Sequence, residues 1–108
     1  MDIHTLRERV RAGDYLVTSH VVQHALKEGF ERKHVVEAVL NGAVIEEYPD
    51  DQRVLVCGTI TLSESLSVYM HVVCEHADAV YIEFVTAYIP DGLEWEYPPT
   101  RRRRRKKR

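Results

Sequence analysis

The chain of 108 residues contains only two cysteines, Cys57 and Cys74, and no Cys-x-x-Cys pair. Two cysteines are too few for a disulfide framework or for the common cysteine-rich zinc sites. No apolar run approaches the roughly 20 residues that a membrane-spanning helix requires, and the N-terminus lacks the apolar segment of a secretory signal. These absences favour a cytoplasmic protein with reduced thiols and without a membrane span, a metal or a cofactor.

Basic residues are scarce over the first 100 positions. The last eight residues, RRRRRKKR, hold eight of the 15 lysines and arginines, so residues 1–100 carry seven basic and 17 acidic side chains, a net charge of −10. A run of eight like charges is predicted to be disordered and to attract polyanions such as RNA. A solubilising tail, or a tail that folds back on the acidic body, is the alternative.

We therefore expect one folded domain over residues 1–100 and a disordered basic tail over residues 101–108. The RNA-binding candidates in this tail are Arg101, Arg102, Arg103, Arg104, Arg105, Lys106, Lys107 and Arg108.

Helical periodicity is confined to the first 42 residues. Apolar stripes predict helices over residues 3–12, from about 19 to 28, and over about 32–41. Gly29 and Gly42 are the expected stops of the second and third helices. The expected caps are Thr5 with Glu8 in the first helix and Thr18 or Ser19 in the second. The expected buried face of the second helix consists of Val22, Ala25 and Leu26.

After Gly42 the pattern changes to the alternation typical of strands. The segments AVIEEY, RVLVCGTITL, LSVYMHVVCE and AVYIEFVTAYI are joined by short polar connections, as antiparallel hairpins are. We therefore predict an α+β fold, with N-terminal helices packed on one face of a four-stranded antiparallel sheet. Counting from short loops places His71 opposite Cys57 on one side and opposite Glu83 on the other. The same register puts Cys57 and Cys74 on opposite faces, which excludes a disulfide between them.

Four strings of the sequence resemble a known family. They are TSH, then EGF..KHVVEAVLNGAVIEEYPDD, then VYMHVVC and then VTAYIPDGLEW, and together they span about residues 15–97. Their order and spacing resemble the bacterial domain of unknown function 4258. The positions that match the family's histidines, its Thr-x-Tyr-x-Pro and its following tryptophan are His20, His71, Thr86, Tyr88, Pro90 and Trp95. One departure is the arginine that the family often carries at the position of Ala25.

This resemblance implies a fold related to the barnase/RelE-like ribonucleases, which many toxins of toxin–antitoxin pairs use. It also implies RNA as a partner and, as a second partner, a small zinc-finger antitoxin-like protein of the kind often encoded beside family members. The implied activity is metal-independent cleavage of RNA.

Such cleavage activates a ribose 2′-hydroxyl for attack on the neighbouring phosphate, which requires a base, an acid and a cation. By resemblance, His20 and His71 form the acid–base pair, because imidazole exists in both protonation states near neutral pH. We expect Thr86 and Tyr88 to donate to the phosphate. The expected supporting residues are His24 beside His20, Glu83 beside His71, and Arg53, which together with the tail supplies positive charge.

Two other interpretations remain open. His20 and His24 lie at i and i+4 and can share a metal, but zinc needs at least a third ligand, for which His71 or Cys57 are candidates. The acidic body and the missing arginine favour a non-catalytic interaction module of the same fold that binds a partner protein or RNA. Packing roles are the alternative for Tyr88 and for Trp95, which can anchor the C-terminal segment over the sheet. Surface positions are expected for His4, His34 and His76.

Overall fold

The second half of the chain forms most of one five-stranded sheet. The computed structural model of the protein describes residues 1–104. Its elements are α1 (Ile3–Arg11), β1 (Tyr15–Val17), α2 (Ser19–Glu28), α3 (Arg32–Asn41), β2 (Ala43–Tyr48), the short 3-10 helix η1 (Pro49–Asp51), β3 (Arg53–Ser63), β4 (Leu66–Glu75) and β5 (Ile82–Tyr88). The predicted α+β class is confirmed, and helices 2 and 3 end at the expected glycines.

The sheet has the strand order β1-β5-β4-β3-β2. Strands β2 to β5 are antiparallel neighbours, but β1 runs parallel to β5 and pairs residues 15–17 with residues 82–84. The prediction of four strands, all antiparallel, was therefore wrong. Three residues are too few to show an alternating pattern, and the partner of this strand lies at the other end of the chain.

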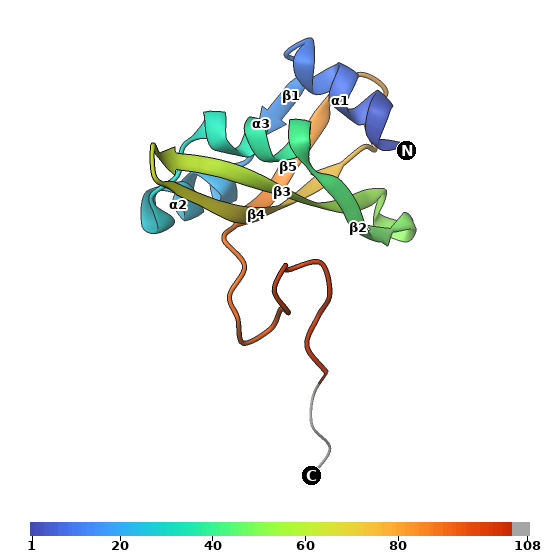
Figure 1. Cartoon of the computed structure of the whole chain (residues 1–108). Coiled ribbons are helices and arrows are strands. Elements are labelled where there is room, and N and C mark those ends of the chain that lie inside the picture. Colours follow the sequence, from blue (N-terminus) through green and yellow to red (C-terminus); the bar gives the residue numbers. More distant parts are fainter. Residues whose placement is uncertain (105–108) are drawn as a thin grey trace.

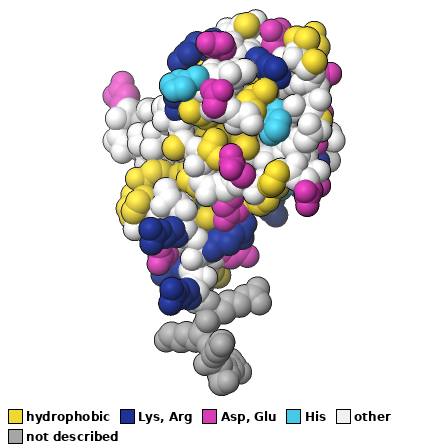
Figure 2. Space-filling model, turned by 90° about the vertical axis from the view of Figure 1, so that its right-hand side faces the viewer, with side chains coloured by type: hydrophobic (Ala, Val, Ile, Leu, Met, Phe, Trp, Pro, Cys, Tyr) yellow, Lys and Arg dark blue, Asp and Glu magenta, His cyan; other side chains and the backbone are white. Residues whose placement is uncertain are grey.

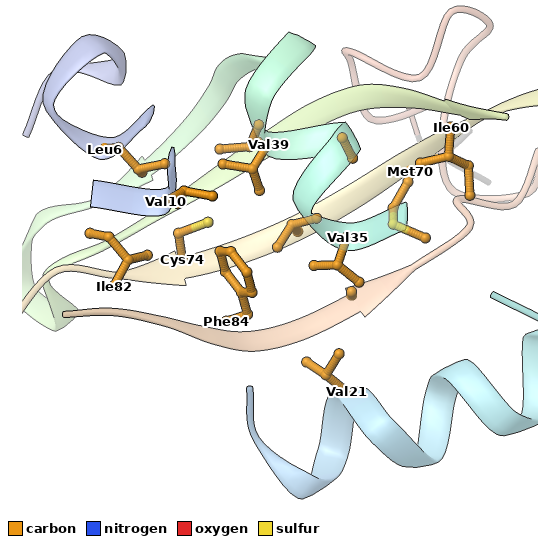
Figure 3. Packing of buried hydrophobic residues seen from close by; sticks show 14 of the residues in the cluster. Leu6, Val10, Val21, Val35, Val39, Ile60, Met70, Cys74, Ile82 and Phe84 are labelled. Atoms are coloured by element: carbon orange, nitrogen blue, oxygen red, sulfur yellow. The ribbon is translucent and has the colours of Figure 1, made fainter. Parts of the chain in front are cut away.

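Helices α1 and α3 lie on one face of the sheet (Figure 1). Their apolar residues meet those of β4 and β5 in the main core, where Leu6, Val39 and Phe84 are among the buried side chains (Figure 3). Helix α3 approaches β3 closely, because a Cβ atom added at Gly58 would lie 2.0 Å from the carbonyl oxygen of Ala38. Within residues 1–104, no helix is long and apolar enough to cross a membrane.

Helix α2 packs against β5 with a face that shares only Ala25 with the one expected. Val21 points into the core and is 1% exposed, whereas Val22 and Leu26 are 46% and 83% exposed. The start of the helix explains this rotation. Thr18 caps the helix, and its backbone N–H and its hydroxyl also donate to carbonyl oxygens of β5. These bonds fix the first turn so that Val21 faces the sheet.

Two of the expected polar positions also differ. Asp2, and not Thr5, caps α1, since the carboxylate of Asp2 accepts the N–H of Thr5 at 3.0 Å. His34 is not a surface residue but is 6% exposed, and its Nδ1 accepts the backbone N–H of Glu31 at 2.8 Å. An imidazole in the capping role that Glu or Gln usually fills is difficult to foresee from the sequence.

The register of the central strands is right on one side and wrong on the other. His71 lies opposite Cys57, as predicted, but its partner on β5 is Tyr88, while Glu83 pairs with Glu75. The connection between β4 and β5 is longer than assumed, because the carboxylate of Asp78 accepts two backbone N–H groups and forms a turn there. A bulge in the β4–β5 pairing adds a further shift.

The two cysteines are free and buried, as expected. Cys74 belongs to the main core on the helix side of β4. Cys57 lies opposite His71, and His71 and Cys74 are three residues apart on one strand, so their side chains point to opposite faces.

Candidate functional site

The sheet face opposite α1 and α3 is covered by the end of the chain. Residues 89–104, here named the C-terminal strap, leave β5 and turn back below the sheet (Figure 1). Trp95, which is 2% exposed, and Pro99 are buried, whereas most other residues of the strap are exposed. Trp95 therefore anchors the C-terminal segment, which is the packing role considered for it from the sequence.

His71 lies on the central strand of this face and has no exposed surface. Its Nε2 donates to the carbonyl oxygen of Pro99 at 2.7 Å, so this nitrogen carries a proton. Burial lowers the pKa of His71 below its ordinary value, although the bond to Pro99 and the charge of Glu46 act in the opposite direction. The ring is thus neutral near pH 7, and Nδ1 accepts the hydroxyl of Tyr88 at 3.2 Å.

Two aromatic rings fix the His71 imidazole in place. The centroid of the Trp95 ring lies 4.3 Å from that of His71 at an interplanar angle of 86°, and the Tyr88 ring lies 5.2 Å away at 69°. Burial raises the pKa of Tyr88 to about 12, so its phenol stays protonated and able to donate. Two of the candidate residues, His71 and Tyr88, thus form a hydrogen-bonded pair beneath the strap.

A charged pair lies next to this histidine. The Nε and Nη2 atoms of Arg102 donate to the two carboxylate oxygens of Glu46 at 2.9 and 3.0 Å. The Cζ atom of Arg102 lies 4.6 Å from the centroid of the Trp95 ring, and the Tyr48 hydroxyl donates to Glu46 Oε1. The bonds from Arg102 lower the pKa of Glu46, which is therefore ionised. A guanidinium and a carboxylate are held in a fixed geometry beside an imidazole.

Three other candidates lie further from His71. Arg53 is on β3, where its Nε donates to Glu75 at 3.0 Å. Thr86 precedes Tyr88 by two residues on β5 and shares its face of the sheet. Glu83 lies opposite Glu75, so it cannot orient His71 as the assumed register implied.

The histidines of α2 form a separate row. The His20 and His24 rings have centroids 4.5 Å apart. His24 Nδ1 and Glu28 Oε2 are 2.9 Å apart, and Glu28 Oε1 accepts the backbone N–H of Ile89 at 3.1 Å. The row therefore extends from His20 to the backbone of Ile89, the residue that follows Tyr88. Among the described residues, the contacts of His20 join it to His24, whereas those of His71 are with Tyr88, Trp95 and Pro99.

Part of the basic tail makes contacts with the rest of the protein. Arg102 pairs with Glu46, and the backbone N–H of Arg103 donates to Glu94 at 2.8 Å, so both arginines fold back on the acidic body. For Arg102 and Arg103, this agrees with the alternative considered for the tail, in which it folds back on the body. The predictions for Arg105, Lys106, Lys107 and Arg108 lie outside the described residues.

Sequence reasoning missed Glu46, Tyr48 and Glu28. The spacing of Glu46 and Tyr48 in AVIEEY was an available signal, since residues two apart on a strand share a face. The sequence did not predict that the strap covers this face, because the strap lacks any helical or strand periodicity. Within residues 1–104, no group of three or more His, Cys, Asp or Glu side chains is arranged to hold a metal ion.

A comparison with protein families identifies a matching family. The model of the family described as Domain of unknown function (DUF4258) matches residues 17–89. The match extends from the last residue of β1 to the first residue of the strap. No curated protein and no solved structure matches the chain.

Proposed function

The chain belongs to the DUF4258 family of domains of unknown function, and from this premise we propose that it is a ribonuclease-like domain that cleaves single-stranded RNA without a metal. One observation carries the proposal. An imidazole, a carboxylate and a guanidinium, those of His71, Glu46 and Arg102, are gathered on one face of the sheet. Acid–base cleavage of RNA needs a base, an acid and a cation, and these three groups can take those roles.

Each group has a role in the proposed reaction. Glu46 takes the proton from the ribose 2′-hydroxyl, and His71 donates a proton to the leaving 5′-oxygen. Arg102 holds the phosphate and takes the place of the arginine that the family often carries at the position of Ala25. Tyr88 orients His71 through Nδ1, and Thr86 is a further donor to the phosphate. His20, with His24, is the alternative proton-transfer group if α2 rather than β2 faces the substrate.

Substrate binding would also activate the groups. A phosphate that draws Arg102 away from Glu46 removes the bonds that lower the pKa of this carboxyl, which makes Glu46 a stronger base. Moving Pro99 away from His71 admits solvent, which raises the pKa of His71 towards its ordinary value of about 6.5. The imidazolium needed for proton donation is then accessible near neutral pH.

The resemblance to toxin domains extends the proposal to a biological role. We include in it a toxin that arrests growth by cutting RNA, and a zinc-finger antitoxin-like protein as the partner that restrains it. Induction of the chain in bacteria, with and without such a partner, tests this role by growth rate.

Purified variants test the chemistry directly. Cleavage of a single-stranded RNA in the presence of a chelator is measured for the parent and for Glu46→Gln, His71→Asn, Arg102→Ala and His20→Ala. We expect losses on the order of 10²–10⁴-fold for the first two, the usual value of a positioned acid or base. Glu47→Gln is the matched control, because Glu47 is the exposed neighbour of Glu46 on the same strand. A parent that leaves RNA intact, or equal rates for the parent and all of Glu46→Gln, His71→Asn and His20→Ala, rules out the enzyme.

The non-catalytic interaction module is the second candidate. It is favoured by a specific observation: His71 has no exposed surface, and partners within the protein occupy both its ring nitrogens. In this case RNA or a partner protein binds the exposed arginines of the strap and remains uncut. Binding of RNA by the parent without cleavage, at any pH from 5 to 9, would decide for this candidate.

A further inference from the structure

We propose that the hollow between the C-terminal strap and the start of β4 binds one nucleobase of a single-stranded RNA, with the attached phosphate lying towards Arg103. This inference deepens the proposed function and rests on it for the choice of RNA as the ligand. The hollow has a volume of about 250 Å³, which is enough for a base with part of its ribose.

The walls of the hollow are aromatic. Tyr69 of β4 and Tyr97 of the strap meet edge to face, with ring centroids 5.4 Å apart at an angle of 78°, and Trp95 and Pro99 complete the apolar lining. Tyr97 is 84% exposed, so the fold does not need its ring for burial. Exposed aromatic rings on a nucleic-acid-binding surface serve as stacking platforms for bases.

One edge of the hollow is formed by an arginine. Arg103 lines the aromatic hollow and also two neighbouring hollows, whose walls include Arg101, Arg102 and Arg104. In Figure 2, basic side chains gather beside a hydrophobic area at the lower end of the described chain. An apolar pocket with positive charge on one side is complementary to a nucleotide, which has a flat base and an anionic phosphate.

Two carboxylates limit how the nucleotide can lie. Asp91 and Glu96 also line the hollow. The carboxylate of Asp91 accepts the backbone N–H groups of Leu93 and Glu94 at 2.8 and 3.1 Å, so it serves the turn of the strap. Glu96 is exposed and also lines the neighbouring hollow that contains Arg101–Arg104, so it offsets part of the positive charge there. We therefore place the phosphate towards Arg103, which borders all three hollows.

The hollow is also adjacent to the proposed catalytic groups. Tyr69 and His71 are two residues apart on β4, so their side chains are neighbours on one face. A base held against Tyr69 thus brings its phosphate close to the face that carries His71 and Arg102. The hollow would act as the subsite that positions the RNA for cleavage.

The single tryptophan of the chain reports on this site, because Trp95 lines the hollow. The probes are uridine and adenosine 5′-monophosphates and a four-nucleotide RNA, titrated against the intact chain while Trp95 fluorescence is recorded. We expect saturable quenching by all of them. Tyr97→Ala should weaken binding by about tenfold or more, in line with the contribution of one stacked base, and Tyr97→Phe should bind like the parent.

Matched variants separate stacking from charge. Tyr81→Ala is the control for Tyr97→Ala, because Tyr81 is also exposed but precedes β5, at the opposite end of this strand. Arg103→Ala should weaken binding at low salt and have little effect at 1 M salt, where phosphate contacts are screened. Arg11→Ala, at the exposed end of α1, is its control.

The outcomes distinguish the pocket from the proposed enzyme. Equal affinities for the parent and Tyr97→Ala overturn the pocket, even if the parent cuts RNA. Quenching by a polyanion without bases that matches quenching by RNA overturns it too. Base-dependent binding that Tyr97→Ala weakens supports the pocket, even if no variant cuts RNA and the enzyme proposal fails.

Discussion

His71 is a neutral imidazole enclosed by the protein, and its burial links stability to pH. Because its pKa is lower in the folded state than in the unfolded chain, the unfolded chain binds more protons as the pH falls below about 6.5. The contribution of His71 to stability is therefore present at and above neutral pH and is lost on acidification.

We predict that the free energy of unfolding of the parent decreases between pH 7.5 and 5, and that His71→Asn removes part of this dependence. Denaturant titrations at a series of pH values measure it. His4→Asn is the control, since His4 is exposed. A parent and a His71→Asn variant with the same slope against pH would show that His71 is not the group responsible.

Arg102 and Glu46 fasten the strap to β2 at the element scale. The pair is partly exposed, with side-chain exposures of 56% and 24%, and such pairs contribute up to about 1 kcal/mol. The contact of Arg102 with the Trp95 ring adds on the order of 0.5–1 kcal/mol.

We therefore expect Arg102→Ala to reduce the free energy of unfolding by about 0.5–2 kcal/mol and to shift Trp95 emission to longer wavelength, because water gains access to the indole. Arg104→Ala, which removes a charge from the same exposed segment, should leave the emission unchanged. Unchanged emission for Arg102→Ala as well would mean that the strap is held by Trp95 and Pro99 alone.

Helix α3 crosses β3 at close range where Gly58 faces Ala38. A Cβ atom at Gly58 would overlap the Ala38 backbone, which cannot move without displacing the helix. We predict that Gly58→Ala lowers the free energy of unfolding by at least about 1–3 kcal/mol, the usual cost of overpacking. Thermal unfolding measures this, with Gly92→Ala as the control because a Cβ atom at Gly92 meets open space. A Gly58→Ala variant as stable as the parent would mean that α3 can shift away from β3 without loss of stability.

The elements differ in how well the sequence predicts them. Helix α3 was predictable because its apolar period and Gly42 agree. The β4–β5 register was not, because it depends on a local turn at Asp78, which lengthens the connection, and on a bulge in the pairing of the two strands. Among the candidate site residues, His71 with Tyr88 came from the family resemblance, whereas Glu46 required knowledge that Arg102 returns across the sheet.

At the scale of the whole molecule, eight of the 15 basic residues lie in the last eight positions, and residues 1–100 have a net charge of −10. For the RNA ligand proposed above, we therefore expect approach from the arginines at the end of the strap. Because Arg102, which fastens the strap to Glu46, is one of these arginines, we expect RNA binding and exposure of His71 to be coupled.

Deletion of residues 105–108 separates these two effects, because it spares the Arg102–Glu46 pair. We predict that it lowers the log–log salt slope of RNA binding by up to about 3, since each phosphate neutralised on a single strand contributes roughly 0.7. Filter binding at several salt concentrations measures the slope. Deletion of four residues with no change in slope would assign the electrostatic attraction to Arg101–Arg104.

The parallel pairing of β1 with β5 joins two ends of the chain. The partner of residues 15–17 follows β2, β3 and β4 in the sequence, so this pairing closes a long loop, whereas the antiparallel hairpins can form locally. Strand β5 lies between β1 and β4 in the sheet. A folding intermediate that has not yet docked β5 therefore has an open sheet edge and an uncovered core, which make it a substrate for chaperones or for aggregation.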